Sequence, residues 1–350
     1  MTSPIKPYRI NVPDSVLQTL QKKLELTSYP GETTFTNDWK YGASLQDVKR
    51  LVDHWQTAFD WRRAEAKLNQ LPQFTTSIQV DGHEDDLQIH FVHQRSKNAN
   101  SIPLLFVHGW ASSFVEATKI LPLLTQTSDD KTQSFHVIAP SLPNCGFSQR
   151  TSKPGFGILQ HAEVCHKLML QLGLTQAEKE GLKRTQDFTE NGSGYNNIQK
   201  TRPHTLGFAL VDSPIALLAW IYEKLRDWTD DYEWADDEVL TWISIYLFSE
   251  AGPDASIRLY YDIVNPAASG RLDGKFESFM KYNTIPLGLS YFPKDVIVVP
   301  SSWGRTLGPV AFERRHTEGG HFAAYEKPEL LVADLRALVE NVGVSFNRAG

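Results

Sequence analysis

The chain of 350 residues is long enough to bury one large hydrophobic core or two modest ones, and its composition is that of an ordinary globular protein. Its 35 basic and 41 acidic residues give a formal net charge of −6, which argues against a surface for nucleic acid or anionic membranes. The two cysteines, Cys145 and Cys165, are too few for a disulfide framework and match no metal spacing. We therefore expect a cytoplasmic protein with no metal and no cofactor.

Residues 1–72 are predicted to be mainly helical. Leu17, Leu20 and Leu24 fall on one face of a segment that begins after Pro13. Ser44, with Asp47 three residues later, resembles a capping box at the start of SLQDVKRLVDHW. The apolar positions of that segment again share one face, so we expect both helices to pack against the rest of the protein.

Residues 73–174 change to a strand pattern. TTSIQV and LQIHFVH alternate on either side of Asp81-Gly82, which predicts a hairpin. IPLLFVHG and SFHVIAP are continuously apolar, which favours parallel strands buried on both faces. The segment GFGILQHAEVCHKLMLQLG then predicts a helix that ends at Gly173. This order of elements is typical of an α/β domain.

Residues 175–265 lose the strand pattern and predict helices at QAEKEGLKRT, SPIALLAWIYEKLRDW and DDEVLTWISIYLF. Residues 266–350 restore a strand at VIVVP, residues 296–300, and end with a loop and a helix near Pro328. No run of ~20 uninterrupted apolar residues occurs, and no apolar run of signal-peptide length stands near the start, so no transmembrane segment is expected.

The stretch VHGW, ending at Trp110, places His-Gly at the end of a predicted buried strand. A sharp turn there can aim a backbone N–H at a developing oxyanion, although a turn glycine with a structural histidine would give the same letters. His321 lies in a loop before the last helix, and Asp295 stands 26 residues upstream, at the head of the VIVVP strand. A carboxylate in that place can orient the imidazole of a general base.

Three tyrosines are candidates for hydrogen-bond donors. Tyr195 follows GSG in the helical region, and Tyr260 and Tyr261 stand together in IRLYYD. Two phenolic O–H groups could polarise an epoxide or another strained ether, although packing is the commoner role of a tyrosine.

These segments together resemble the epoxide hydrolases of the α/β-hydrolase fold, in particular the microsomal and fungal type with an N-terminal helical meander. The resemblance covers nearly the whole chain and rests on YRINVPDSVLQTLQKKL, DWKYG, FDWRRAEAKLNQLPQF, HFVHQRS, PLLFVHGW, VIAPSLPNCGFS, GSGYNNIQKTRPHTLGFALVDSP, WTDD and EGGHFAAYEKPELL. It implies an α/β-hydrolase core in residues 73–174 and 266–350, an N-terminal meander in residues 1–72 and a helical lid in residues 175–265.

The resemblance also implies a two-step reaction. An aspartate opens the epoxide and forms an alkyl-enzyme ester, which water activated by a histidine then hydrolyses to the diol. By resemblance His321 is that base, Asp295 is its acidic partner, and backbone N–H groups near Trp110 form part of the oxyanion hole. Tyr195 is the first lid tyrosine, and Tyr260 is the second, with Tyr261 as its competitor.

The nucleophile of the family is absent from the sequence. It normally stands on a strand-to-helix elbow such as Gly-Gly-Asp-Trp-Gly, and no Gly-x-Asp-x-Gly, Gly-x-Ser-x-Gly or Gly-x-Cys-x-Gly occurs in this chain. The helix ending at Gly173 runs directly into TQAEKEGLKRTQDF, which resembles the lid just before Tyr195. The elbow strand, its helix and the next strand, roughly 30 residues or more, are therefore expected to be missing, which leaves the central sheet incomplete. A second departure is Ala111, where the family usually has proline.

No other acidic residue replaces the elbow aspartate in the sequence. Asp187, Glu178 and Glu180 lie nearby, but nothing around them resembles a strained turn, so they are interpreted as helix-surface or capping residues.

Three functional hypotheses follow. The first is an epoxide hydrolase-like protein that is inactive as written, through gene loss or a transcript that skips coding sequence. The second is a working enzyme in which His321 and Asp295 activate water directly. The third is a non-catalytic binding or scaffold protein that keeps an apolar pocket. The expected ligand is a small apolar epoxide or a related molecule, and a homodimer is possible.

Overall fold

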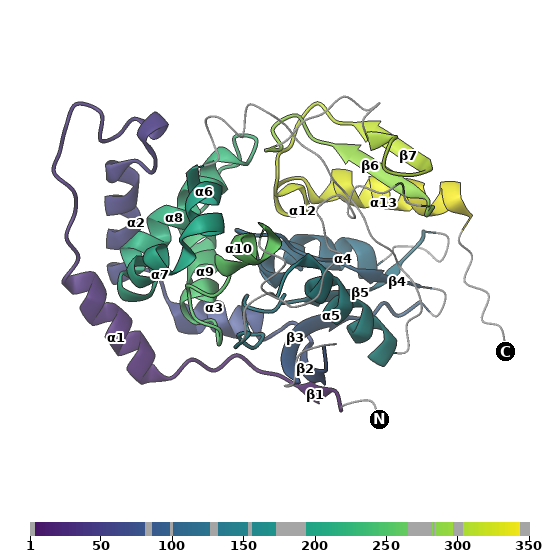
Figure 1. The fold of residues 1–350 in the computed structure, drawn as a ribbon, viewed down its shortest axis with the longest axis horizontal. Coiled ribbons are helices and arrows are strands. Elements are labelled where there is room, and N and C mark those ends of the chain that lie inside the picture. Colours follow the sequence, from purple (N-terminus) through teal and green to yellow (C-terminus); the bar gives the residue numbers. More distant parts are fainter. Residues whose placement is uncertain are drawn as a thin grey trace.

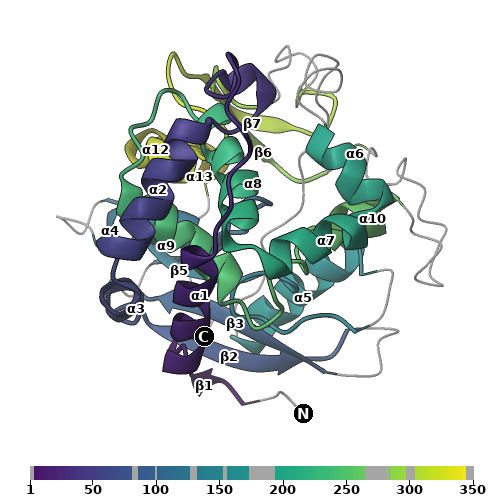
Figure 2. The same cartoon turned by 90° about the vertical axis from the view of Figure 1, so that its left-hand side faces the viewer.

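The computed structural model describes residues 4–80, 86–98, 101–126, 132–152, 156–172, 194–264, 282, 284–296 and 304–343. The N-terminal segment contains the helices α1 (Asp14–Glu25), α2 (Leu45–Thr57) and α3 (Trp61–Leu68), with a 3-10 turn at Trp39–Tyr41. The predicted cap of α2 is confirmed, since Ser44 Oγ accepts a hydrogen bond from Asp47 N over 3.4 Å. The helices α1 and α2 pack against the teal and green helices of residues 214–247, as Figures 1 and 2 show.

The first sheet has the strand order β1-β2-β3-β5-β4. Its strands are β1 (Lys6–Pro7), β2 (Gln73–Ile78), β3 (Leu87–Gln94), β4 (Ile102–Leu105) and β5 (Phe135–Pro140). The strands β2 and β3 pair antiparallel, which confirms the hairpin partners, and β4 pairs parallel to β5. The short strand β1 was not predicted, because a two-residue strand has no periodicity to read.

The two strands expected to be buried on both faces differ in burial. β5 is buried along most of its length, as predicted. In β4 only Ile102 is buried, and Pro103, Leu104 and Leu105 are half-exposed, so the prediction is wrong for this strand. The reason is its position: β4 ends the strand order of the first sheet, and β5 is the neighbour it has among the described strands.

A second sheet holds the C-terminal part of the core. β6 (Leu287–Tyr291) and β7 (Val310–Arg315) pair parallel to each other and pack on α13 (Pro328–Val342). Between β7 and α13 lies the short helix α12 (Ala323–Glu326), and Pro328 occupies the first turn of α13 as predicted. The strand expected at residues 296–300 lies outside the described residues except for Val296, which is in a bend.

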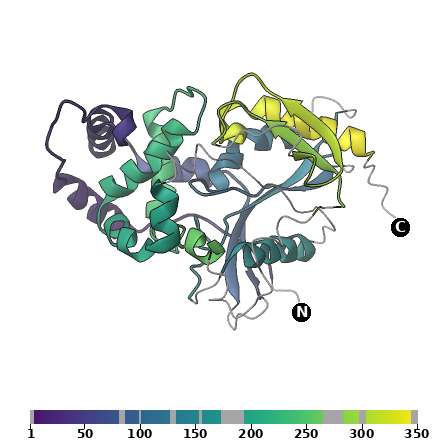
Figure 3. The same cartoon turned by 45° about the horizontal axis from the view of Figure 1, so that its top comes forward.

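Within the described residues the strands therefore form two separate sheets, with β4 and β6 each at an end of its own strand order. Figure 3 displays the β6–β7 pair and its helix beside the larger sheet. The helix α4 (Ile120–Thr125) packs on β5 and on α13, and α5 (Ile158–Gln171) contacts β2. The helix α5 agrees with the prediction, while its expected end at Gly173 lies outside the described residues.

The helical region predicted to be a lid, called the lid below, is described for residues 194–264 and contains α6 (Gly194–Thr201), α7 (Pro203–Asp212), α8 (Pro214–Asp227), α9 (Asp236–Leu247) and α10 (Arg258–Val264). The predicted helices at 213–228 and 236–248 correspond to α8 and α9, and the one expected at 176–185 lies outside the described residues. No single described helix is long and apolar enough to cross a membrane; α7 and α8 pass that test only as a pair bent by 116°.

Candidate active site

The site begins with a histidine and a carboxylate from two loops. His321 stands just before α12, and Asp295 follows β6. The structure brings them together, with 2.8 Å between His321 Nδ1 and Asp295 Oδ1. Since Nδ1 faces a carboxylate, it carries the proton, and Nε2 is left as the basic nitrogen. The backbone supports this pairing, because Lys294 N donates to Gly319 O over 3.0 Å.

Two lid tyrosines face each other. The hydroxyl groups of Tyr195, on α6, and Tyr260, on α10, are 3.4 Å apart. Tyr261 is 36% exposed, so the geometry favours Tyr260 as the partner of Tyr195. Burial raises the pKa of both phenols above the usual value of 10, so both keep their protons at neutral pH and can donate hydrogen bonds.

Aromatic rings connect the tyrosine pair to the histidine. The Trp110 ring stacks on Tyr195 with centroids 5.2 Å apart and planes inclined by 8°, and it meets Tyr260 edge-on. Trp228 contacts Tyr195 and His321, in each case with ring centroids 5.3 Å apart. The indole Nε1 of Trp110 is buried and has no hydrogen-bond partner in the structure described above. The candidate site therefore has apolar walls and a small set of polar groups.

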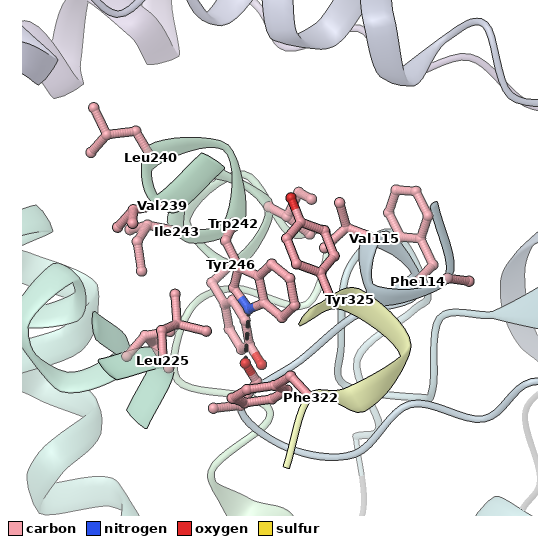
Figure 4. Close-up of a cluster of buried hydrophobic side chains, with 14 of the residues drawn as sticks. Phe114, Val115, Leu225, Val239, Leu240, Trp242, Ile243, Tyr246, Phe322 and Tyr325 are labelled. Atoms are coloured by element: carbon pink, nitrogen blue, oxygen red, sulfur yellow. Dashed lines mark hydrogen bonds between the residues drawn. The ribbon is translucent and has the colours of Figure 1, made fainter. Parts of the chain in front are cut away.

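The turn after β4 is fixed from two sides. His108 Nε2 accepts from Leu142 N over 3.1 Å, and burial lowers the pKa of His108 to about 4, which keeps it neutral. From the lid, Trp242 Nε1 donates to Ala111 O over 2.8 Å, and Tyr246 O–H donates to Ser112 O over 2.7 Å. Figure 4 shows Trp242 and Tyr246 on α9 within a cluster of buried hydrophobic side chains that includes Phe322 and Tyr325. These two bonds hold the turn although Ala111 replaces the proline expected from the family.

A further acidic side chain lies close to the histidine. Glu116 belongs to the 3-10 helix Phe114–Lys119, which packs on α12. Burial raises the pKa of its carboxyl to about 7, against the opposing effects of a hydrogen bond from Ser112 and of the nearby His321. Sequence reasoning missed Glu116, because a glutamate in FVEATK has the pattern of an exposed helical residue. Its burial is decided by α12, which follows about two hundred residues later.

Asp187, Glu178 and Glu180, which were interpreted as helix-surface or capping residues, lie outside the described residues. The structure thus brings together five of the residues predicted for the site, His321, Asp295, Tyr195, Tyr260 and Trp110. Among the residues that the structure describes, no group of histidine, cysteine and acidic side chains is arranged to hold a metal ion.

Comparison with known proteins agrees with this geometry. Residues 5–117 match the family model "Epoxide hydrolase N terminus", and residues 102–177 match the model of the "alpha/beta hydrolase fold". A Stigmatella aurantiaca protein, provisionally named an epoxide hydrolase, is 35% identical over 387 residues, which cover 95% of this chain and 84% of that protein. Epoxide hydrolase 1 of Sus scrofa is 30% identical and covers 95% of this chain and 88% of its own length.

Two solved structures have the same fold. The Aspergillus niger epoxide hydrolase superposes with a TM-score of 0.81 at 31% identity, over 97% of both chains. The juvenile hormone epoxide hydrolase of Bombyx mori gives a TM-score of 0.85 at 23% identity, over 97% of this chain and 95% of that one. With the sequence relatives, these likenesses establish that the chain belongs to the epoxide hydrolase family of the α/β-hydrolase fold.

Proposed function

We propose that this chain keeps the binding and water-activating groups of an epoxide hydrolase but lacks the attacking carboxylate, so that it does not convert epoxides to diols as written. The observation that carries the proposal is the assembled pair of His321 and Asp295 beside Tyr195 and Tyr260, in a chain whose sequence holds no nucleophile elbow. The ligand class is a small apolar epoxide or a related molecule.

In the full reaction each of these groups has a defined task. The two phenols would donate hydrogen bonds to the epoxide oxygen, and one phenol would give that oxygen its proton when a carboxylate attacks the ring carbon and breaks the C–O bond. The proton that ester hydrolysis releases would later restore the phenol. His321 Nε2 would then remove a proton from water, whose oxygen attacks the ester carbonyl and releases the diol and the carboxylate. Without the first attack there is no ester, and the histidine has nothing to hydrolyse.

Two further observations support a missing segment. The alignment with the S. aurantiaca relative spans 387 positions, whereas this chain has 350 residues. At least 37 residues of the relative therefore have no counterpart in this chain. The described strands also form two sheets, with β4 and β6 at their ends. A strand and its flanking segments removed between them would produce this division, because parallel strands are normally buried within one continuous sheet.

Glu116 is a poor substitute for the lost aspartate. A carboxyl with a pKa of about 7 is half protonated at neutral pH, and only its charged form attacks an epoxide. It also lies on a 3-10 helix that packs on α12, rather than on an elbow that projects a side chain into the site.

Styrene oxide tests the proposal. We expect the purified chain to give no more phenylethanediol than buffer, whereas a family member with the elbow, assayed in parallel, gives clear turnover. Diol formation above background that is lost in His321→Ala would contradict the proposal and favour direct attack by activated water. Sequencing the transcript across Gly173 and Thr175 would separate a skipped segment from a loss in the gene.

A second candidate function is non-catalytic binding, and the buried indole N–H of Trp110 favours it. A buried donor without a partner is costly, and an oxygen of a bound ligand would satisfy it. Titration with phenylethanediol, followed by tryptophan fluorescence, should saturate and should weaken about tenfold in Tyr195→Phe if binding uses this site. The predicted homodimer and the cytoplasmic location stay predictions.

A further inference from the structure

The loop that carries His321 is held by a buried carboxylate from outside the reacting pair. Glu326 is 7% exposed, and its two oxygens accept hydrogen bonds from two different segments. Oε1 accepts from Gly320 N over 2.9 Å, and Oε2 accepts from Asp230 N over 2.8 Å. One side chain thus joins the residue before His321 to the turn that follows α8.

The same two segments are joined by two further bonds. The carboxylate of Asp230 accepts from Gly319 N over 2.7 Å, and His321 N donates to Trp228 O over 2.7 Å. Three consecutive backbone N–H groups of the histidine loop therefore donate hydrogen bonds to Asp230, Glu326 and Trp228. Backbone N–H bonds to carboxylates, here the buried Glu326 and the partly buried Asp230, are stronger than bonds to neutral acceptors, so this connection resists displacement of the loop.

The two glycines are required by this close approach. Gly319 has a φ of +100°, a conformation that other residues adopt only with strain. A Cβ on Gly320 would stand 2.5 Å from Trp228 O and 2.9 Å from the Cα of Thr229. Glycine is therefore required at both places, at Gly319 by its backbone conformation and at Gly320 by the close approach of the WTDD segment.

We propose that Glu326 and Asp230 are positioning residues for His321: they fix the loop so that the imidazole Nδ1 meets Asp295 and Nε2 is presented to the site. The inference rests on the proposed function, because it matters only if His321 is the base. It adds to that proposal the groups that set the direction of the imidazole, and it explains why Trp228 is held both against the ring and against the backbone of the histidine.

The test reads the His321–Asp295 bond directly. In protein labelled with ¹⁵N-histidine, the Nδ1 proton shared with a carboxylate gives a strongly deshielded resonance, which His321→Ala identifies. We expect this resonance to be lost in Glu326→Gln. The glutamine oxygen can accept a hydrogen bond from one of the two backbone N–H groups, but the NH₂ group would then face the other N–H, donor against donor. Asp230→Ala should weaken it, and Asp230→Asn, which still presents an oxygen to Gly319 N, should leave it nearly unchanged.

Glu65→Gln is the matched control. Glu65 is also 7% exposed, and it accepts from the backbone N of Val12 over 2.7 Å, but it belongs to α3. Its variant should lose stability without changing the His321 resonance. If Glu326→Gln loses stability and keeps the resonance, the carboxylate is only structural and the inference is wrong.

If Glu326→Gln does not fold, Asp230→Ala decides, since it removes a single bond: an unchanged resonance in that variant overturns the inference and a weakened one supports it. The measurement needs no substrate. Diol formation by the unmodified chain would overturn the proposed function and leave this result standing.

Discussion

The neighbourhood of His321 and the two described sheets differ in how their contacts are made. Around His321, contacts come from loops and lid helices that are far apart in the sequence, and the histidine–aspartate pair, the tyrosine pair and Glu326 are all hydrogen-bonded. In the sheet, β4 and β6 depend on neighbouring strands, and each ends its own strand order in the described structure. Under the proposal of a missing segment, a site built from many separate contacts would keep its arrangement, whereas each of the two sheets would lose a neighbouring strand.

The largest expected effect comes from restoring the proposed missing segment. Insertion of the strand–helix–strand unit of an active relative between Gly173 and Thr175 should raise diol formation from styrene oxide by about 10³-fold or more over background. The reason is that His321, Asp295 and the two tyrosines already have their partners. The same insert with its elbow aspartate changed to asparagine is the control. Failure of the restored chain, if it folds, would mean that the surviving site is not correctly arranged.

Acid should act first on the sheet. His90 is buried, with Nδ1 2.9 Å from Ser141 Oγ and Nε2 2.9 Å from Gln73 Oε1, and burial lowers its pKa to about 3. The unfolded chain binds a proton below about pH 6.5, whereas the folded chain does so only near pH 3. The free energy of unfolding should therefore fall as pH decreases, by about 3 kcal/mol at pH 4.

Urea titrations at pH 7 and pH 4 would measure this loss. His90→Gln should show a smaller difference between the two pH values. An equal difference in that variant would assign the acid sensitivity to other groups, among them His93, His108 and His161, whose pKa values burial also lowers.

Raising the pH from 4.5 to about 7 should destabilise the site. The unfolded chain ionises Glu116 near pH 4.5, while burial holds the folded pKa at about 7, so stability is present at low pH and is lost as pH rises through this range. Glu116→Gln should therefore be more stable than the unmodified chain at pH 8, by about 3 kcal/mol, and nearly equal to it at pH 4. A constant difference between the two proteins across this range would contradict the burial argument.

The smallest expected effect concerns the turn between the two regions. Trp242→Phe keeps an aromatic ring but leaves Ala111 O without its donor, which should cost about 1–2 kcal/mol of unfolding free energy. Tyr246→Phe is a parallel variant for Ser112 O. Chemical denaturation with a probe in β5 and another in the lid would compare the regions. No loss of stability in either variant would show that the turn is held by packing alone.

Much of this site could be predicted from short segments of sequence. The pairing of His321 with Asp295, the tyrosine of the lid and the cap at Ser44 each have a local pattern, either a motif or a residue spacing. The burial of Glu116, the reach of Trp242 to Ala111 and the bridge made by Glu326 have none, because each depends on elements that meet only after the chain has folded. The half-exposed β4 was mispredicted for a similar reason, since an apolar strand does not specify its neighbours.

The two bonds from α9 to the turn after β4 determine how the lid can move. Trp242 and Tyr246 connect α9 to backbone oxygens of the core, so swinging this helix outward would break both bonds and would cost about 1–3 kcal/mol for each. These two bonds therefore attach α9 to the core. The helices α6 and α10 contact each other and carry the facing tyrosines, so a movement of either helix would change the distance between the two hydroxyl groups.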